Sequence, residues 1–416
     1  MKKRLLLITN GFPFGQSERG FLSEEAKLLA EEFDLLVLAP ENQEELLYPT
    51  DGILRIERYR YSSFRKTHQF RALPRIVCWS TLREACALAK AHRFSNPIGD
   101  LRQTLYHRFN VWEMEEKIEK LVREEKIDIV YAYWCCEYAI AAAFLKKRFP
   151  KLKVIIRFHG MDLYNERAHG NWQHFRKDVA RYADGLVFAC EYGRTYFQEH
   201  WGTEFAQKMQ VSYLGSPDRG KLPIQQTMDL HIISCSNLIP LKQVDRIIAG
   251  LSLLPQTVRV TWDMFGDGVD RKKLEALAEE KFRKCPHIQW TFHGFVPNAV
   301  LAEAYQAVKP NLFITTSSTE GGAPVSIQEA FSMGIPAIGT AIGGIPDLII
   351  DGQTGFLLPP QASPEDVAHA VMQYADCTAE ERQRMADAAR RHWAEKFDAR
   401  ANAERFAAYL HDLVSE

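Results

Sequence analysis

The segment "NLFITTSSTEGGAPVSIQEAFSMGIPAIGT", residues 311–340, decides the class of fold. An apolar run is followed by a loop with two adjacent glycines, by a stretch from Pro324 to Met333, and, after Gly334, by a second apolar run. This order predicts a β-strand, a helix that starts at Pro324, where proline is favoured, and a second, parallel strand. Such a strand, helix and strand form the repeating unit of an α/β protein.

The same alternation extends in both directions along the chain. Strands are expected at "RLLLIT", "DLLVLAP", "DIVYAYW", "KVIIRFH", "GLVFAC" and "MQVSYL" in the first half, and at "LHIISCS", "RVTWDMFG", "IQWTFHG", "NLFITT", "PAIGT" and "GFLLPP" in the second. Helices are expected at Ser23–Glu32 and Trp112–Glu125, among others. Near-continuous runs of Val, Ile and Leu are typical of strands buried on both faces, so the sequence predicts an α/β fold with parallel sheets.

The length of the chain predicts two domains, because 416 residues exceed what one hydrophobic core usually serves. Between the two series of strands, "GSPDRGKLPIQQTMD" is polar and broken by two prolines and a glycine, which is typical of a linker. We therefore expect a first domain at 1–215, a linker at 216–229 and a second domain at 230–393. Two parallel sheets of this kind would place a ligand cleft at the carboxyl ends of their strands.

Composition excludes several classes of function. Lys plus Arg number 52 against 53 Asp plus Glu, and no nucleic-acid motif occurs, so nucleic acid is not expected as a partner. The eight cysteines lack the spacing of a disulfide framework, which favours reduced thiols in a cytoplasmic protein. No apolar stretch reaches the roughly 20 residues of a membrane-spanning helix. No motif has metal-ligand spacing, so we expect a metal-independent protein without a cofactor.

Two carboxylates flank the glycine pair of the opening segment. Glu320 lies in the predicted loop and Glu329 about two turns into the predicted helix, so both could face a ligand at the end of the sheet. The amides at the helix start, where an anion is favoured and glycine permits close approach, belong to Gly321, Gly322 and Ala323. A second glycine pair at 343–344 follows the next strand. The pattern indicates a ligand with phosphates and sugar hydroxyls; taken singly, the two glutamates could also be ordinary solvated residues.

The stretch "EGGAPVSIQEAFSMGIPAIGTAIGGIPDLIIDGQTGFLLPP" resembles the signature of the GT-B glycosyltransferases of family 4. The resemblance implies two Rossmann-like domains and retaining transfer of a hexose-type sugar from a nucleotide diphosphate sugar, with a UDP-sugar favoured. A hydroxyl of a glycan or lipid-linked acceptor, in cell-surface polysaccharide synthesis, would receive the sugar. The resemblance also implies that Glu320 binds the donor sugar and Glu329 the nucleotide ribose. One difference is that this chain has one residue more between the two glutamates than is usual in the family.

Further donor contacts are implied by "SCSNLIPLKQVDRIIAGL", which resembles the family segment that holds the diphosphate. Lys242 takes the place of the family lysine, and Asn237 stands where the family has an arginine. An amide can still donate hydrogen bonds to phosphate, although without the charge that strengthens them. Gly266, in a tight turn after a predicted strand, is expected near the donor.

The first half of the chain carries further resemblances. The stretch "HGMD" is similar to the family element whose histidine lies against the transferred sugar, which implies a catalytic role for His159 and a contact for Asp162. In the first loop we expect donor-phosphate contacts from Gly15, Gln16 and Ser17, and an acceptor contact from Glu18. The segment 394–416 resembles the family's closing helix, which packs back on the first domain.

The segment from Arg58 to Arg108 is strongly basic, with eleven Lys and Arg residues against only Glu84 and Asp100. Aromatic residues are interleaved with these cations. This composition suits anionic lipid headgroups or a lipid-pyrophosphate acceptor, so peripheral contact with the inner face of the cell membrane is one expectation. Solvated helix faces over a partly buried core are the other.

Other functions remain open from the sequence. A nucleotide-sugar epimerase would share the two-domain architecture. A sugar phosphorylase would release sugar 1-phosphate from a glycan, although the sequence has no signature of a lysine-bound cofactor. A non-catalytic carbohydrate-binding protein would be favoured if Asn237 and the longer spacing between the glutamates marked a decayed donor site.

Overall fold

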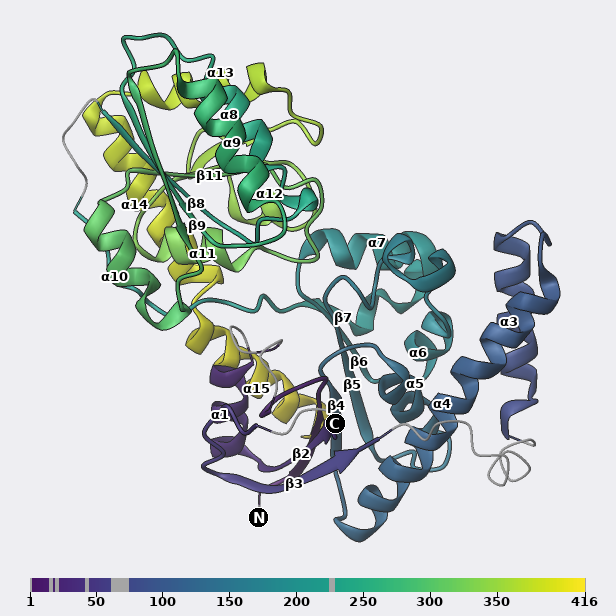
Figure 1. The fold of residues 1–416 in the computed structure, drawn as a ribbon. Coiled ribbons are helices and arrows are strands. Elements are labelled where there is room, and N and C mark those ends of the chain that lie inside the picture. The colour runs from purple at the N-terminus through teal and green to yellow at the C-terminus, as the bar shows by residue number, and fades with distance from the viewer. Residues whose placement is uncertain are drawn as a thin grey trace. The chain divides into compact units, whose positions relative to one another are not determined.

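The computed structural model describes residues 2–14, 18, 22–41, 45–60, 75–223 and 229–415. The chain forms two compact units (Figure 1). The first contains Met1–Ser212 and Ala403–Glu416, and the second contains Tyr213–Asn402. The first unit therefore draws on both ends of the chain.

The first unit is built on a seven-stranded sheet, counted over the described residues, in the order β3-β2-β1-β4-β5-β6-β7. All neighbouring strands are parallel. The strands are β1 (Arg4–Ile8), β2 (Asp34–Pro40), β3 (Ile53–Tyr59), β4 (Ile129–Ala132), β5 (Lys153–Phe158), β6 (Gly185–Phe188) and β7 (Met209–Val211). The central strands are buried on both faces, as their continuous apolar runs predict.

Helices connect these strands. They are α1 (Ser23–Glu32), α3 (Trp79–Ala91), α4 (Pro97–Glu124), α5 (Glu137–Leu145), α6 (Arg176–Tyr182) and α7 (Glu191–Trp201), with 3-10 turns at Asn165–Arg167, His169–Asn171 and Thr203–Lys208. The helix expected at Trp112–Glu125 starts much earlier, at Pro97. The Asn96 side chain caps it by accepting a hydrogen bond from the Gly99 amide at 3.1 Å, and proline suits the first helical position.

The second unit has a six-stranded parallel sheet in the order β10-β9-β8-β11-β12-β13, again over the described residues. Its strands are β8 (Leu230–Cys235), β9 (Val260–Phe265), β10 (Ile288–Gly294), β11 (Leu312–Thr315), β12 (Ala337–Thr340) and β13 (Gly355–Leu358). Its helices are α8 (Val244–Leu251), α9 (Arg271–Phe282), α10 (Asn298–Val308), α11 (Val325–Ser332), α12 (Ile345–Leu348), α13 (Pro364–Ala375) and α14 (Ala379–Lys396), with a 3-10 turn at Pro240–Lys242. Two apolar clusters, one around Trp262 and one around Phe331, form its core. The predicted α/β class with two parallel sheets is confirmed.

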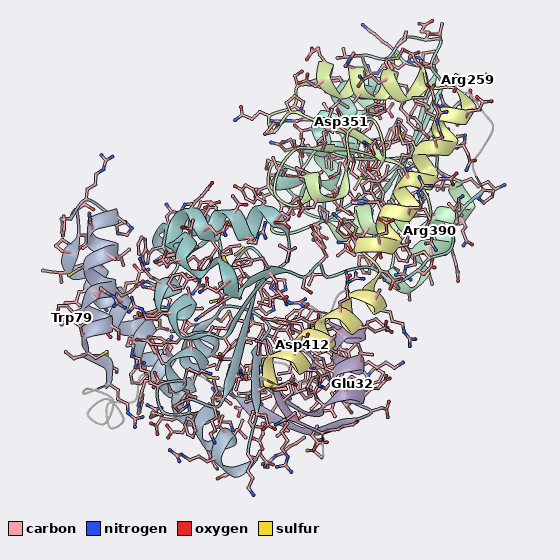
Figure 2. All side chains as sticks on the ribbon, turned by 180° about the vertical axis from the view of Figure 1, so that it is seen from behind. Glu32, Trp79, Arg259, Asp351, Arg390 and Asp412 are labelled. Atoms are coloured by element: carbon pink, nitrogen blue, oxygen red, sulfur yellow. The ribbon has the colours of Figure 1, made fainter. Side chains whose placement is uncertain are left out.

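The segment expected to be a linker, 216–229, belongs to the second unit where the structure describes it. The Leu222 amide donates to the Met333 carbonyl at 2.9 Å. Arg390 of α14, labelled in Figure 2, donates to both carboxylate oxygens of Asp218 at 2.8 and 2.6 Å. Polar residues and prolines predict exposed chain, but they do not reveal that such a chain is held by ion pairs.

The last helix, α15 (Ala399–Ser415), continues from the second unit into the first. Its residue Phe406 is buried with its ring centre 4.8 Å from that of Tyr131 on β4. The ring of His411 stacks on Phe33 at 4.5 Å, and its Nε2 atom lies 3.3 Å from the Oε2 atom of Glu32, the last residue of α1. Figure 2 labels Glu32 and, next to His411 in the chain, Asp412. The end of the chain thus completes the covering of the first sheet.

Arg157 on β5 is a buried cation that joins three elements of the first unit. Its side chain has no exposed surface, and its Nη2 atom lies 2.9 Å from the Glu25 Oε2 atom on α1. Its guanidinium lies 4.7 Å from the ring centre of Phe406 on α15. Tyr131 also donates a hydrogen bond to Glu25, at 2.8 Å. The buried positive charge of Arg157 and the buried negative charge of Glu25 therefore neutralise each other.

We predict that Arg157→Ala lowers the free energy of unfolding of the first unit by about 3–5 kcal/mol, because it leaves the buried Glu25 carboxylate without its cation. The measurement is urea-induced unfolding of the full chain. The matched control is Arg259→Ala in the second unit, whose partner Asp229 lies 2.9 Å away and whose side chain is 72% exposed. Exposed pairs contribute only about 0–1 kcal/mol, so equal losses in the two variants would contradict this role of Arg157.

Candidate functional site

The loops that follow β8 and β11 are bound together at the carboxyl edge of the second sheet. The Ser318 amide donates to the Leu241 carbonyl at 2.8 Å, and the Thr316 hydroxyl donates to the Gln243 carbonyl at the same distance. At this junction the Lys242 Nζ atom lies 2.5 Å from the Glu320 Oε1 atom. Two residues that the sequence placed on separate motifs are thus neighbours, one a candidate phosphate-binding cation and one a carboxylate.

Glu329 lies on α11 and is buried, with 4% of its surface exposed. Its Oε1 atom accepts a hydrogen bond from Asn298 Nδ2 at 2.7 Å and lies 3.3 Å from Arg219 Nη2. Burial raises the pKa of Glu329, and the hydrogen bond from Asn298 and the charge of Arg219 only partly offset the rise. Asn298 and Arg219 also bond to each other. The three side chains therefore form one hydrogen-bonded group beside the β11 loop, in which Glu329 is buried and Asn298 is exposed.

Sequence reasoning missed Arg219 and Asn298. Arg219 lies in the segment interpreted as a linker, and Asn298 begins α10, far from any quoted motif. A lone cation in a polar, proline-broken stretch carries no signal of its own. Only the structure points to them, because it shows that the Glu329 carboxylate is buried and therefore requires partners.

The two glycine-rich loops are in direct contact. Gly343 has a φ of +50°, and a Cβ atom there would lie 2.4 Å from the Glu320 carbonyl oxygen. A Cβ atom at Gly344 would lie 2.4 Å from the Ala323 nitrogen and from the Gly322 carbonyl carbon. Real Cβ atoms do not approach other atoms this closely, so glycine is required at both positions. The loop after β12 thereby fixes the backbone from Glu320 to the start of α11.

Gly266 and Asn237 occupy neighbouring positions in this unit. Gly266 has a φ of +130°, and a Cβ atom there would lie 1.9 Å from the Ser236 carbonyl oxygen. Its need for glycine is therefore explained by the loop after β8 passing over it. Asn237 is exposed in that same loop, and its carbonyl accepts from the Ile239 amide at 3.0 Å. Asn237 precedes Lys242 in the segment between β8 and α8, and Gly266 lies against that segment at Ser236.

In the first unit, His159 follows β5 and is buried, with 7% of its surface exposed. Its ring centre lies 4.0 Å from that of Trp134, which follows β4. Burial, together with the charge of Arg157, lowers the pKa of His159 well below its usual range. The imidazole is therefore neutral near neutral pH. It can donate one hydrogen bond and accept another, but it carries no charge.

Asp162 holds the loop that carries His159. One carboxylate oxygen accepts from the amides of His159 and Gly160 at 2.9 and 3.0 Å, and the other accepts from the Cys135 amide at 2.7 Å. Burial raises the pKa of Asp162 in spite of these bonds. The side chain joins the loops after β4 and β5, so its contacts are with the protein's own backbone.

Glu18 has a similar role in the first loop. Its Oε1 atom accepts from the Asn10 amide at 2.9 Å and from Trp134 Nε1 at 2.6 Å. Its Oε2 atom accepts from the amides of Gly11 and Phe12 at 3.0 and 2.6 Å. Glu18 has no exposed surface. Four donors saturate the carboxylate, so in this structure it shapes the loop after β1 and has no capacity for the acceptor hydroxyl that the sequence led us to expect. The expected phosphate contacts Gly15, Gln16 and Ser17 lie outside the described residues.

A cavity of about 390 Å³ opens at the same edge of the first sheet. Its lining includes Trp134, Trp172, Glu137, His107, His174 and Gln173. His107 Nδ1 lies 3.2 Å from Glu137 Oε1, and this hydrogen bond lowers the pKa of Glu137 although burial opposes it. Burial beside His107 and Arg176 lowers the pKa of His174 to about 3. The cavity thus combines aromatic faces with fixed hydrogen-bonding groups, as small-molecule sites in proteins generally do.

Sequence reasoning missed this cavity. The run "YWCCEY" comes directly after the apolar residues of β4, and in a parallel sheet that position is the carboxyl end of a strand. Reading it as a loop at the functional edge would have identified Trp134 and Glu137. The walls from Trp172 to Arg176 could not have been assigned, because they come from a later loop.

Two families match this chain. The family described as "Glycosyl transferases group 1" matches residues 219–392, and the family described as "Glycosyl transferase 4-like" matches residues 75–185. The first match lies in the second unit and contains Lys242, Glu320 and Glu329. The second lies in the first unit and contains His159.

Individual relatives agree with these matches. The GtfA subunit of the UDP-N-acetylglucosamine–peptide N-acetylglucosaminyltransferase of Streptococcus parasanguinis is 24% identical over 278 residues, which cover 64% of this chain and 53% of that protein. The matched part thus spans about half the length of that relative. The amylovoran biosynthesis glycosyltransferase AmsK of Erwinia amylovora is 24% identical over 378 residues, covering 86% of this chain and 87% of that protein.

The fold has solved counterparts. The crystal structure of the Anabaena protein HepE, in complex with UDP and glucose, superimposes with a TM-score of 0.65 at 18% identity and covers 99% of this chain and all of that one. Two Rossmann-like units with parallel sheets define a GT-B fold. The chain belongs to the group 1 glycosyltransferases of this fold, which correspond to family 4. The resemblance seen in the sequence is thereby confirmed.

We predict that Glu18→Gln destabilises the first unit by about 1–3 kcal/mol. The NH2 group of glutamine would face N–H donors and could not accept their hydrogen bonds, so buried donors would be left unsatisfied. Thermal unfolding of the full chain is the measurement. Glu24→Gln on α1 is the matched control, since that side chain is exposed. A loss no larger than that of Glu24→Gln would show that the four hydrogen bonds of Glu18 do not support the loop.

Proposed function

We propose that the protein is a retaining glycosyltransferase that moves a hexose-type sugar from a nucleotide diphosphate sugar to a hydroxyl of a glycan or lipid-linked acceptor. A UDP-sugar is the favoured donor, and polysaccharide synthesis in the cytoplasm is the favoured context. The observation that carries the proposal is the contact between Lys242 and Glu320, with the buried Glu329 on the adjoining helix. The UDP and glucose in the HepE complex, and the biosynthetic role of AmsK, support it.

The donor is assigned to the second unit. A nucleotide diphosphate sugar supplies each member of the Lys242–Glu320 pair with a partner of suitable chemistry. The ammonium group of Lys242 would bind the diphosphate, and the carboxylate of Glu320 would accept hydrogen bonds from sugar hydroxyls. The amides of residues 321–323 are assigned to the diphosphate, together with Asn237. Gly266 leaves room for the loop that carries Asn237.

Glu329 is assigned to the ribose of the nucleotide. Both of its contacts to Arg219 and Asn298 involve Oε1. Among the described residues, Oε2 is therefore the oxygen that remains for the paired hydroxyls of a ribose. Arg219 keeps a compensating charge beside the carboxylate, which reduces the cost of holding it in a buried place.

The proposed reaction needs no base from the protein. The bond between the anomeric carbon and the phosphate oxygen breaks, and its electron pair stays with the phosphate. The acceptor oxygen bonds to the anomeric carbon on the same face, and its proton passes to the departing phosphate oxygen. Lys242 and the amides at the start of α11 would stabilise the negative charge that develops there, which is where preorganised groups contribute most. No metal is assigned a role in this step.

The acceptor is assigned to the cavity of the first unit. The rings of Trp134 and Trp172 offer apolar faces for a sugar, while Glu137 and Gln173 offer hydrogen-bonding groups. His159, neutral and in contact with the ring of Trp134, is assigned to the reacting end of this cavity. Asp162 and Glu18 are assigned positioning roles, because their carboxylates already bind backbone amides.

We predict that UDP raises the unfolding temperature and that Lys242→Ala reduces the affinity for UDP at least tenfold. A ligand at 100 times its dissociation constant stabilises the native state by about 2.7 kcal/mol, so a thermal-shift panel of UDP, GDP, ADP and their sugars detects binding. Lys272→Ala, at an exposed position on α9, is the matched control. A chain whose unfolding temperature responds to none of these nucleotides would refute the proposed donor.

We predict that Glu320→Gln retains UDP binding, or binds UDP more tightly, and loses at least tenfold in turnover of the nucleotide sugar. The substitution removes a negative charge next to the diphosphate and frees Lys242 from its ion pair, but it also removes the carboxylate that would bind the sugar. Isothermal titration with UDP and a product assay with UDP-sugars measure the two effects. Unchanged turnover, or UDP affinity reduced as in Lys242→Ala, would contradict the assignment of Glu320 to the sugar.

A further inference from the structure

The helical hairpin of α3 and α4, residues 75–106, carries an unusual concentration of exposed apolar side chains. The largest exposed fractions belong to Ile98 at 81%, Trp79 at 78% and Phe94 at 63%, and Val77, Leu82 and Tyr106 are also largely exposed. Contiguous exposed apolar patches of this kind mark interaction sites in soluble proteins. In Figure 2 the labelled Trp79 lies on the side of α3 that is turned away from the rest of the first unit.

The exposed side chains recur at helical spacing. Along α3 and its end, positions 79, 82, 83, 86, 90 and 93 are exposed, and along the start of α4 positions 98, 101, 102 and 106 are exposed. Intervals of three and four residues place each series on one stripe of its helix. The 13 residues of α3 extend about 20 Å at about 1.5 Å per residue. The stripe is therefore long enough to lie along a surface.

The exposed charges of residues 75–106 have one sign. The exposed residues from 75 to 106 include Arg75, Arg83, Lys90, Arg93 and Arg102 but no carboxylate. The two acidic residues of the segment, Glu84 and Asp100, are buried. Arg75 pairs with Glu116, further along α4, and Arg83 pairs with Asp178 of α6. The end of the hairpin near Lys90, Arg93 and Arg102 thus presents cations between exposed apolar side chains.

The structure shows that not all of the basic residues in segment 58–108 belong to one exposed cationic surface. Arg108 is buried and pairs with Glu115 at 2.8 Å, and Arg58 donates to the Pro40 carbonyl at 3.0 Å and lies over the ring of Phe14. Residues 61–74 are outside the described part of the chain. The surface to be explained is therefore the outer face of the hairpin, not the whole segment.

This hairpin also builds the wall of the acceptor cavity. Glu84 accepts hydrogen bonds from Trp172 Nε1 and from the Phe175 amide, both at 2.8 Å. His92 Nε2 lies 2.9 Å from the Gly170 carbonyl oxygen, and Gln103 donates to the His169 carbonyl at 3.2 Å. His107, further along α4, lines the cavity itself. The hairpin thus has an exposed outer face and also supports one wall of the cavity.

We propose that the outer face of the α3–α4 hairpin binds a lipid bilayer that carries anionic headgroups. Trp79, Phe94 and Ile98 enter the interfacial region, and Lys90, Arg93 and Arg102 bind the headgroups. Resting on the proposed function, this docking places the cavity beside the bilayer, where the sugar of a lipid-linked acceptor would enter it while the lipid remains in the membrane. Mixed apolar and cationic character favours a bilayer over a protein partner, whose interface core would be depleted of charge.

The test is co-sedimentation of the full chain with vesicles of phosphatidylcholine, alone or with about one third phosphatidylglycerol. We expect binding to the anionic vesicles, weakened by high salt because exposed charges are screened. The variant Lys90→Glu/Arg93→Glu/Arg102→Glu is expected to bind at least a hundredfold more weakly, since each cation near an anionic surface contributes about 1 kcal/mol. The variant Trp79→Ser/Phe94→Ser/Ile98→Ser is expected to lose at least tenfold.

Matched controls come from the second unit. Lys272→Glu/Lys273→Glu removes exposed cations from α9, and Val269→Ser/Phe295→Ser removes side chains that are 84% and 74% exposed. Both controls should bind vesicles like the unchanged chain. Absence of binding to anionic vesicles, or equal losses in the hairpin variants and controls, would overturn the proposal. Thermal shifts with UDP on the same proteins separate the two questions, because a failed donor assignment removes the UDP shift and leaves vesicle binding intact.

Discussion

The contact between the loops after β11 and β12 is the constraint on which the second unit's site depends. At Gly343 and Gly344 the two backbones approach so closely that no side chain fits between them. This contact fixes the chain from Glu320 to the start of α11, and hydrogen bonds to Leu241 and Gln243 fix the loop after β8 against the same backbone. Three strand ends are thereby held as one surface, and the side chains on it need little rearrangement to receive a ligand.

Much of this architecture was predictable from the sequence, because parallel strands buried on both faces consist of continuous runs of apolar residues. The strands and most helices follow directly from that pattern. The start of α4 at Pro97 was missed. Exposed apolar and basic side chains are common in its first turns, and they obscure the helical periodicity of the apolar residues. The segment 216–229 was interpreted as a linker for a related reason. Proline and polar residues indicate an irregular backbone, but the ion pair from Asp218 to Arg390 is a contact with a residue distant in sequence.

The site was predictable where a motif combines with backbone geometry and unpredictable where it depends on hydrogen-bond partners. The resemblance to a family motif singled out Glu320, Glu329 and Lys242, and the fold brings Lys242 and Glu320 into contact. Glu18 and Asp162 were also singled out as candidate contact residues, but each accepts three hydrogen bonds from backbone amides, and Glu18 accepts a fourth from Trp134. The residue type alone cannot distinguish a carboxylate that binds a ligand from one that organises a loop.

The helix α15 passes from the second unit into the first, and the boundary falls between Asn402 and Ala403. Residues such as Phe406 and Leu410, which are buried in the first unit, are therefore synthesised after the whole of the second unit. During translation at about 5–20 residues per second, the first unit waits on the order of tens of seconds for the segment that completes its core. Completion of the first unit's core therefore depends on synthesis of the whole second unit, which is contiguous in sequence.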